Sequence, residues 1–394
     1  MARRTLHSAL RTPHLKRLVP LLLDWFAENA RDLPWRRTRD PYAIWVSEIM
    51  LQQTQVKTVI PFWNRWMREL PTIEAAAKAS PAKIHKLWEG LGYYTRVRNL
   101  QKAAKQMVQS GKRKAESGNP SGTPHVVSYR FPNKFEDVLA LPGIGRYTAG
   151  AICSIAFNQP TPILDGNVIR VLTRIFGIGE NPREKETNAR LWQLAEELVG
   201  RAVPCPPRRG GDTAPYHCSH LNQSLMELGA LVCTARNPQC GICPVKKLCA
   251  AYRTNRVDEL PNLGKRETAT ARRFVAFVVE QDGRFLVRQR PVGVVNGHLW
   301  EFPNIEIPNG NSNPKLAAKE IFGIAPDIIE PLSTLKHSIT RYRITLEAFA
   351  VSLKKLPSKT VGVLKTPAQM RQLAFTAAHK KLASVANNRI LSAR

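Results

Sequence analysis

Apolar residues recur with helical spacing through the first two thirds of the chain. Between residues 18 and 110 they return every three or four positions, with short turns between the periodic segments. One helix is predicted to begin at Pro41, with Asp40 as its N-cap. The apolar stripe assigned to that helix is Trp45, Ile49, Val56 and Ile60. Helical patterning resumes at Phe135, which predicts an all-α first half.

The period changes beyond residue 272. The segment FVAFVVEQDGRFLVRQR predicts two strands around an Asp282-Gly283 turn, and ITRYRITLEAFAVSL predicts one further long strand. A helix is expected near residues 377–386. The second half is therefore predicted to be a smaller α+β domain.

Segments rich in Gly, Pro, Ser and charge separate the patterned regions, near residues 110–130 and 203–220 and again from 254 to 271. The first two read as surface insertions and the third as the domain linker. The predicted organisation is a basic arm (1–19), a helical domain (20–253), the linker (254–271) and the α+β domain (272–394).

Charge narrows the class of partner. Lysine and arginine total 59 against 30 acidic residues, a formal charge of +29, which favours a polyanionic partner. The 43% hydrophobic content and eight tryptophans indicate folded domains rather than a basic tail. No apolar run is long enough to span a bilayer, so no membrane partner is expected. The acid-free N-terminus is interpreted as an arm that approaches DNA, with a transit peptide as the alternative.

Four cysteines fall close together as C-x6-C-x2-C-x5-C: Cys233, Cys240, Cys243 and Cys249. Such a group indicates a metal or cluster site. Zinc usually takes two short Cys pairs, whereas this uneven spacing favours an iron–sulfur cluster with a structural role. Cys205, His217, Cys218 and His220 are a weaker candidate for a second metal site, and unpaired residues in an insertion are the simpler interpretation.

Two carboxylates have surroundings that suit acid catalysis. Glu48 stands among Trp45, Ile49 and Leu51, where partial desolvation would raise its pKa. Asp165 immediately precedes a predicted helix. The structural alternatives are a polar residue at a core rim for Glu48 and an ordinary N-cap for Asp165. Together, one protonated and one ionised acid form the pair that cleaves a bond between a sugar and a heteroatom.

The stretch LPGIGRYTAGAI places two glycines before a helix, and an ordinary helix-to-helix turn would explain it alone. Its combination with LDGNVIRVLTR resembles the helix-hairpin-helix and catalytic aspartate of the endonuclease III superfamily. WVSEIMLQQTQV, GLGYYTRVRNL, the cysteine loop and LWEFP narrow the resemblance to the adenine DNA glycosylases, over residues 20 to 390.

This resemblance implies roles for individual residues. Glu48 matches the acid that protonates adenine, and Asp165 matches the carboxylate that stabilises the oxocarbenium ion, with Asn167 and Tyr147 assisting. Tyr147 replaces the Schiff-base lysine of bifunctional relatives, which implies a monofunctional enzyme. The other implied positions are Arg31, Leu33, Trp35 and Gln223 near the adenine, and Gln53 and Tyr93 as duplex wedges. Gly143, Gly145 and Arg146 are implied as DNA contacts, with the backbone around the two glycines on a phosphate.

The second half resembles a Nudix fold without the REXXEE run of metal-binding glutamates between Gly293 and Gly323. Recognition is therefore expected instead of nucleotide hydrolysis, and no nucleotide cofactor. The family's Phe-Ser-His recognition loop corresponds here to Ile339, Thr340 and Arg341. Thr340 is expected to hydrogen-bond the lesion and Arg341 to contact DNA.

The implied function is removal of adenine mispaired with 8-oxoguanine or guanine in double-stranded DNA, by a monomer with one 4Fe–4S cluster. Its location would be cytoplasmic at the nucleoid, or organellar or nuclear in a eukaryote. The alternatives are a thymine-mismatch or other pyrimidine glycosylase of the same superfamily, and a non-catalytic lesion binder. Retention of both Glu48 and Asp165 disfavours the binder.

Overall fold

The computed structural model describes residues 2–118, 131–200, 217–265, 268–307, 313–339, 341–353 and 362–392. The chain separates into two compact units. The first comprises residues 1–78 and 99–266, and the second comprises residues 79–98 and 267–394. The division near residue 266 falls inside the segment predicted as a linker, whereas the assignment of residues 79–98 to the second unit is not visible in the sequence.

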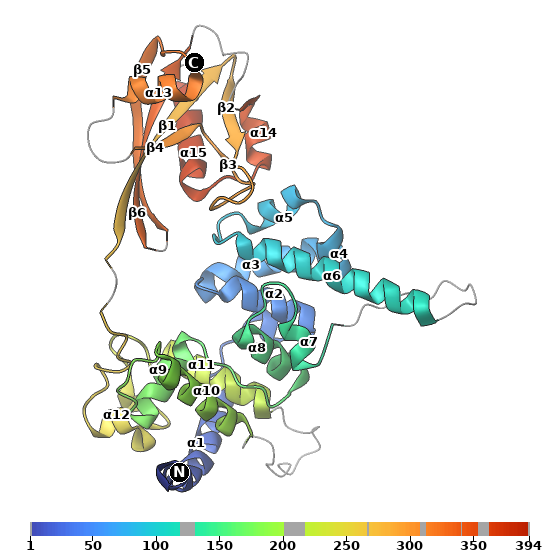
Figure 1. The fold of residues 1–394 in the computed structure, drawn as a ribbon, viewed down its shortest axis with the longest axis vertical. Coiled ribbons are helices and arrows are strands. Elements are labelled where there is room, and N and C mark those ends of the chain that lie inside the picture. The colour runs from blue at the N-terminus through green and yellow to red at the C-terminus, as the bar shows by residue number, and fades with distance from the viewer. Residues whose placement is uncertain are drawn as a thin grey trace. The chain divides into compact units, whose positions relative to one another are not determined.

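The first unit is helical (Figure 1). Its elements are α1 (Ala2–Asn29), η1 (Pro34–Arg36), α2 (Pro41–Leu51), α3 (Val56–Glu69), α4 (Ile73–Lys78), α6 (Thr95–Gly118, from residue 99), α7 (Phe135–Leu139), α8 (Arg146–Phe157), α9 (Gly166–Phe176), α10 (Lys185–Gly200), α11 (His217–Leu231), η2 (Cys240–Ile242), η3 (Lys246–Leu248) and α12 (Ala250–Arg253). Within the described residues, no helix combines the length and the apolar content needed to cross a bilayer.

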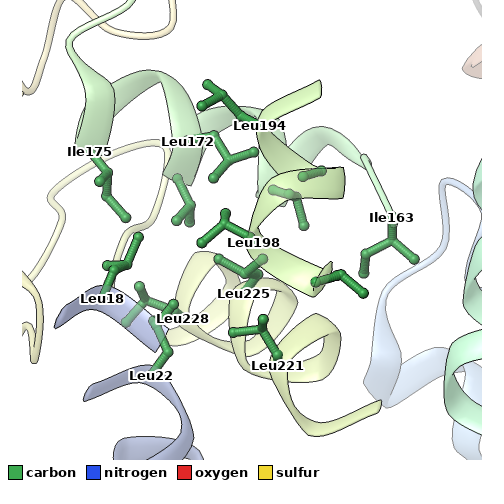
Figure 2. Packing of buried hydrophobic residues seen from close by; sticks show 14 of the residues in the cluster. Leu18, Leu22, Ile163, Leu172, Ile175, Leu194, Leu198, Leu221, Leu225 and Leu228 are labelled. Carbon is green, nitrogen blue, oxygen red and sulfur yellow. The ribbon is translucent and has the colours of Figure 1, made fainter. Parts of the chain in front are cut away.

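The main core of this unit joins α1, α9, α10 and α11 (Figure 2). Leu18 and Leu22 of α1 point toward Leu172, Leu225 and their neighbours, and all of these side chains are buried. Burying a leucine fully is worth about 1.5–3 kcal/mol. This packing holds α9 and α11 together, and with them the residues of both helices that face the pocket described below.

Several predicted boundaries are wrong. Residues 1–19 are not a separate arm, because α1 runs unbroken from Ala2 and Leu15, Leu18 and Val19 are core residues. The stripe ending at Val56 and Ile60 spans two helices, since α2 ends at Leu51. α6 continues into the first predicted insertion as far as Gly118, and α11 begins at His217, inside the second. The remainder of both insertions, 119–130 and 201–216, lies outside the described residues.

The second unit contains a seven-stranded mixed sheet in the order β3-β2-β1-β6-β5, with β4 paired to β1 and β7 paired to β2. β1 and β6 are parallel, and the other pairs are antiparallel. The strands are β1 (Thr270–Gln281), β2 (Arg284–Gln289), β3 (Trp300–Glu301), β4 (Asn304–Ile307), β5 (Ile328–Ile339), β6 (Tyr342–Ser352) and β7 (Val363–Lys365).

Helices cover both faces of this sheet. Alternate residues of β1 enter two different cores, because side chains of a strand point to opposite faces. Ala276 and Val278 pack with α14 (Pro367–Gln372) and α15 (Ala377–Ser392). Val275 and Phe277 pack with α13 (Pro314–Phe322) on the other face. The unit also includes α5 (Pro81–Trp88).

The hairpin predicted at Asp282-Gly283 is confirmed: both residues have positive φ, at 51° and 71°, between β1 and β2. The single long strand predicted for residues 339–353 is wrong at its start. Ile339 ends β5, and β6 begins at Tyr342 and pairs antiparallel with β5, so the predicted segment contains the end of one strand and the whole of the next. The twelve residues of β5 were not predicted, because Pro331 and the polar residues after it obscure the alternation.

Candidate active site

The candidate site is a cavity of about 490 Å³ in the first unit. That volume lies within the range typical of small-molecule sites. Nine of the residues predicted from the sequence line it: Glu48, Tyr147, Asp165, Asn167, Arg31, Leu33, Trp35, Gln223 and Gln53. They come from segments that are up to 192 residues apart, so the fold brings together positions that the sequence only suggested.

Glu48 lies on α2 and is only 4% exposed. Its Oε2 accepts a hydrogen bond of 2.8 Å from the Tyr147 hydroxyl. Burial raises the pKa of Glu48 to about 7, although the tyrosine hydrogen bond acts in the opposite direction. The nearby charge of Asp165 adds to the increase. A carboxyl with this pKa carries a proton in a large fraction of molecules at neutral pH, as a general acid requires.

Asp165 is the N-cap of α9 and also faces the cavity. Its Oδ1 accepts a hydrogen bond from the backbone N–H of Val168 (2.7 Å), and its Oδ2 accepts one from Asn167 Nδ2 (2.9 Å). Burial raises the pKa of Asp165, while these hydrogen bonds and Arg170 favour the anion. The N-cap interpretation and the catalytic one are therefore compatible, because the cap orients the carboxylate.

A third buried carboxylate was missed by the sequence analysis. Glu227 of α11 accepts hydrogen bonds from both nitrogens of the Arg31 fork at 2.8 Å, and from Arg36 at 2.9 and 3.0 Å. Arg36 also donates to Gln223 Oε1. Burial alone would raise the pKa of Glu227, but the hydrogen bonds from Arg31 and Arg36 lower it to about 2. The signal in the sequence was an acid within the apolar run of α11, as for Glu48.

Arg170 of α9 connects the cavity to the cysteine loop. Its guanidinium donates to Asn167 Oδ1 (2.8 Å), to the Gly229 carbonyl (2.7 Å) and to the Cys233 carbonyl (2.7 Å). A Cβ on Gly229 would lie 2.7 Å from the Cβ of Asn167, so glycine is needed for this close packing of α11 on α9. Arg170, which is itself bound to the cysteine loop at Cys233, therefore fixes the orientation of the Asn167 side chain.

The four predicted cysteine ligands line one apolar cavity, with Val171, Ile175, Leu228, Val232 and Val245 among its walls. The Arg174 guanidinium is buried there and lies 3.4 Å from the Cys233 sulfur. Four thiolates around one cavity, with a cation beside them, are the donor set and environment of an iron–sulfur cluster. The residues fit that group, which would hold residues 233–249 in one conformation when bound.

The glycine hairpin joins α7 to α8. Gly143 has a φ of 78°, and a Cβ there would meet the Asn99 side chain at 2.5 Å. Gly145 is the N-cap residue of α8 and faces open space. A helix N-terminus with bare backbone suits an anion such as a phosphate. Arg146, predicted to contact DNA, forms an exposed ion pair with Glu196, and its guanidinium lies 4.0 Å from the Trp192 ring centroid.

Gln53 and Tyr93, the two predicted wedges, share an uncommon backbone conformation. Their φ angles are 57° and 47°, and both side chains are exposed. Non-glycine residues rarely adopt positive φ, and such strain concentrates at functional sites. Gln53 follows α2 in the first unit, whereas Tyr93 follows α5 in the second.

Other predicted positions are less informative. Thr340 lies outside the described residues, as does Cys205. Arg341 is exposed and its guanidinium lies 5.3 Å from the Tyr342 ring centroid. Cys218 is a buried thiol in the core of the first unit, as an unpaired residue would be.

Comparisons with known proteins agree with this geometry. Residues 46–197 match the HhH-GPD superfamily of base excision DNA repair proteins, residues 233–249 match the iron-sulfur binding domain of endonuclease III, and residues 274–385 match the NUDIX domain. The cluster assignment is thereby confirmed. The first unit also resembles a solved structure of a thermostable thymine-DNA glycosylase, with 29% identity and a TM-score of 0.50 over 62% of this chain and 99% of that one.

Curated relatives cover most of the chain. The adenine DNA glycosylase of Rattus norvegicus is 36% identical over 92% of this chain and 76% of its own length. That of Homo sapiens is 34% identical over 86% of this chain and 68% of its own length. With the helix-hairpin-helix unit, the cluster loop and the Nudix-like unit all present in order, this chain belongs to the adenine DNA glycosylase family of base excision repair.

Proposed function

We propose that this enzyme hydrolyses the N-glycosidic bond of adenine paired with 8-oxoguanine or guanine in double-stranded DNA. The observation that carries the proposal is the pairing of two unlike carboxyl groups in one cavity. Glu48 is buried beside the Tyr147 hydroxyl, and the pKa of Glu48 is about 7. Asp165 accepts hydrogen bonds from Asn167 and from the N-terminus of α9. Because these environments favour the protonated form of Glu48 and support the anionic form of Asp165, we assign Glu48 as the acid and Asp165 as the stabilising anion.

The chemistry then proceeds in two stages. Glu48 donates its proton to the adenine ring as the bond between C1′ and the ring nitrogen breaks, and adenine leaves. Asp165 stabilises the positive charge that develops on the sugar, and a water molecule adds to C1′ after losing a proton to Glu48. The flipped nucleotide enters a cavity lined by Trp35, Leu33 and the Arg31–Glu227 pair, which offers apolar faces and a fixed donor for the base.

Tyr147 supports a monofunctional reaction. Its hydroxyl donates to Glu48, and burial together with the two acids raises its pKa well above the usual value, so it remains neutral. A phenol cannot form an imine with the sugar. The product is therefore an intact strand with an abasic site, and borohydride should trap little covalent complex.

The Nudix-like unit is assigned to recognition of the base opposite adenine. Its α13, the helix between Gly293 and Gly323, carries Lys315, Lys319 and a single acid, Glu320, so it lacks the run of glutamates that magnesium-dependent hydrolysis of nucleotides requires. We assign the enzyme as a monomer located with its DNA, at the nucleoid in a bacterium or in an organelle or nucleus in a eukaryote.

Single-turnover cleavage tests this function. Duplexes carrying A, T, C or U opposite 8-oxoguanine or guanine are incubated with excess enzyme, with hot alkali to break abasic sites. Release of adenine alone, faster opposite 8-oxoguanine, is expected. Release of thymine opposite guanine would instead assign a thymine-mismatch glycosylase, and binding without any release would assign a lesion binder.

A further inference from the structure

Residues 79–98 pack as part of the Nudix-like unit, although they lie within the 46–197 stretch that matches the base excision repair family. The chain continues into the first unit at both ends of the segment. It contains α5, the loop after it with Tyr93, and the first residues of α6. The contacts inside the second unit therefore show how this unit holds a piece of glycosylase sequence.

Glu89, the residue after α5, is the centre of these contacts. Its side chain is only 5% exposed. Oε2 accepts hydrogen bonds of 2.8 Å from both Lys86 and Lys380, and Oε1 accepts one of 3.0 Å from the backbone N–H of Phe375. Burial alone would raise the pKa of Glu89, but these donors, Lys380 and Lys86 before Phe375, lower it. A buried carboxylate with three donors is held in one position.

The partners of Glu89 are built into the fold of the unit. Phe375 is a core residue, and its neighbours Ala374 and Thr376 exchange backbone hydrogen bonds with Trp300 of β3 at 2.8 and 3.1 Å. Lys86 also donates to the Leu373 carbonyl at 3.0 Å. The acid is thus bound to a rigid part of the sheet edge and not to a surface loop.

Two further contacts flank this ion cluster. The His85 and His298 rings stack with centroids 5.8 Å apart at 23°. Arg98, the last residue of the segment, donates to the Gly297 carbonyl at 3.1 Å. Contacts on both sides of Glu89 therefore restrict rotation as well as displacement of this part of the segment.

The loop from Glu89 to Tyr93 is short and internally braced. Trp88 Nε1 donates to the Gly92 carbonyl at 3.0 Å, and Arg96 donates to the Leu91 and Gly92 carbonyls. Arg96 also lies 5.6 Å from the Tyr93 ring centroid. The position of Glu89 is therefore transmitted over four residues to an exposed tyrosine, 42% accessible, in a left-handed backbone conformation.

We propose that Glu89 is a positioning residue for lesion recognition, which clamps the Tyr93 loop to the Nudix-like fold. The inference rests on the proposed function, in which the Nudix-like unit inspects the opposite base, and on the wedge role that the family resemblance implies for Tyr93. The clamp makes these two elements one rigid body, so that correct docking on the lesion sets the tyrosine in place. Glu89 touches neither the base nor the sugar.

The test uses the full chain with Glu89→Gln, which keeps the shape and one acceptor but removes the charge that pairs two lysines. Dissociation constants are measured at fixed salt on duplexes carrying a non-cleavable adenine analogue opposite 8-oxoguanine or guanine. The preference for 8-oxoguanine should fall about fivefold or more, as for coupled contacts. The single-turnover rate at saturating enzyme on A:G should stay within about twofold.

Lys380→Met should give the same loss of preference, and the double variant should be no worse than either single one, because all three break one clamp. Lys380 is 56% exposed, so this variant also serves if Glu89→Gln folds poorly. The matched control is Glu330→Gln, which breaks an exposed ion pair with Arg389 in the same unit.

An unchanged preference in folded Glu89→Gln and Lys380→Met overturns the clamp. Equal weakening on both mispairs, in step with a lower melting temperature, also overturns it and leaves Glu89 a structural residue only. Failure of the proposed function would be seen separately, as wild-type enzyme that releases no adenine or binds both mispairs equally.

Discussion

Two regions of one cavity bury an acid in opposite ways. At Glu48 the neighbours are apolar side chains and a tyrosine hydroxyl, and burial raises the pKa to about 7. At Glu227 the neighbours are the guanidinium groups of Arg31 and Arg36, and the pKa falls to about 2. Both carboxyl groups are nearly inaccessible to solvent. The cationic partners, and not the depth of burial, therefore decide which acid carries a proton at neutral pH.

The difference in pKa gives the two carboxyl groups different roles in the site. A carboxyl that titrates near pH 7 can give and take a proton during one turnover. A carboxylate that stays ionised can orient two arginines but cannot act as an acid. The opposite pKa shifts of Glu48 and Glu227 also predict opposite effects of pH on stability.

Glu48→Gln should have the largest effect. The amide keeps the shape but holds no transferable proton, so adenine release should fall by about 10²–10⁴-fold, while mismatch binding is retained. Single-turnover rates and band-shift titrations measure the two quantities. Turnover near that of wild type would remove Glu48 from the mechanism. The variant should also have a higher melting temperature than wild type above pH 7. The pKa of Glu48 is about 7 in the folded state and 4.5 in the unfolded state, so the wild-type protein loses folding stability as the pH rises from 4.5 to about 7.

Cys240→Ser tests whether the Asp165 side of the site depends on the cluster loop. Loss of the cluster should release residues 233–249, which carry Arg236, Lys246 and Lys247, and so weaken DNA binding by about tenfold or more at physiological salt. Arg170 would lose its fixed acceptor at Cys233, so the rate should fall as well. Iron content, visible absorbance and Kd are the measurements. Stoichiometric zinc in protein purified without oxygen, or full affinity without iron, would contradict this expectation.

Glu227→Gln should cost stability more than chemistry. The variant leaves Arg31 and Arg36 without their charged acceptor. This loss should lower the free energy of unfolding by about 1–3 kcal/mol and the melting temperature by several degrees. Because the folded pKa lies below the unfolded 4.5, this destabilisation should be full above pH 4.5 and vanish as pH falls toward 2. Adenine release should fall less than in Glu48→Gln. A drop in rate as large as that of Glu48→Gln would mean that Glu227 is part of the chemistry.

Tyr147→Phe tests the cause of the Glu48 pKa, because it removes the hydroxyl that donates to this carboxyl group and leaves Glu227 unchanged. The hydroxyl donates to the ionised carboxylate and so lowers its pKa, which means that its removal should raise the pKa above about 7. The single-turnover rate of wild type should decline as pH rises past this value, and in the variant the decline should begin at higher pH by roughly half a unit to one unit. A shift to lower pH would reverse the assignment of proton donor and acceptor in this pair.

The sequence supports some of these assignments better than others. Glu48 could be predicted because a carboxyl among Trp45, Ile49 and Leu51 is desolvated wherever the helix packs. Glu227 stands in a similar apolar run, yet its low pKa depends on Arg31 and Arg36, which are almost 200 residues away. Periodicity contains no such pairing. The clamp at Glu89 was invisible for the same reason, since two of its three donors, Phe375 and Lys380, lie almost 300 residues away.

Boundaries show the same limit. The turn at Asp282-Gly283 is determined by two adjacent residues, and the prediction was right. The end of α2 at Leu51 and the start of β5 at Ile328 depend on tertiary packing, and both were missed. The charge at residues 2–17 suggested a free arm, whereas Leu15, Leu18 and Leu22 at helical spacing carry α1 into the core. Local chemistry was therefore predictable and long-range partnership was not.

The smallest expected effect concerns the Nudix-like unit. A single hydroxyl group, that of Thr340, is expected to contribute less than the buried carboxyl groups of Glu48 and Glu227. Thr340 is the residue predicted to hydrogen-bond the lesion, and Arg341 beside it is exposed and suited to phosphate. Thr340→Val removes one hydroxyl at nearly constant shape, so a lost hydrogen bond should cost about 0.5–1.5 kcal/mol, roughly two- to tenfold in binding. The informative quantity is the ratio of A:8-oxoguanine to A:G affinity at fixed salt, since Arg341→Gln should weaken both duplexes alike. A ratio unchanged in Thr340→Val but reduced in Glu89→Gln would place discrimination in the docking of the Tyr93 loop and not in a direct hydrogen bond to the lesion.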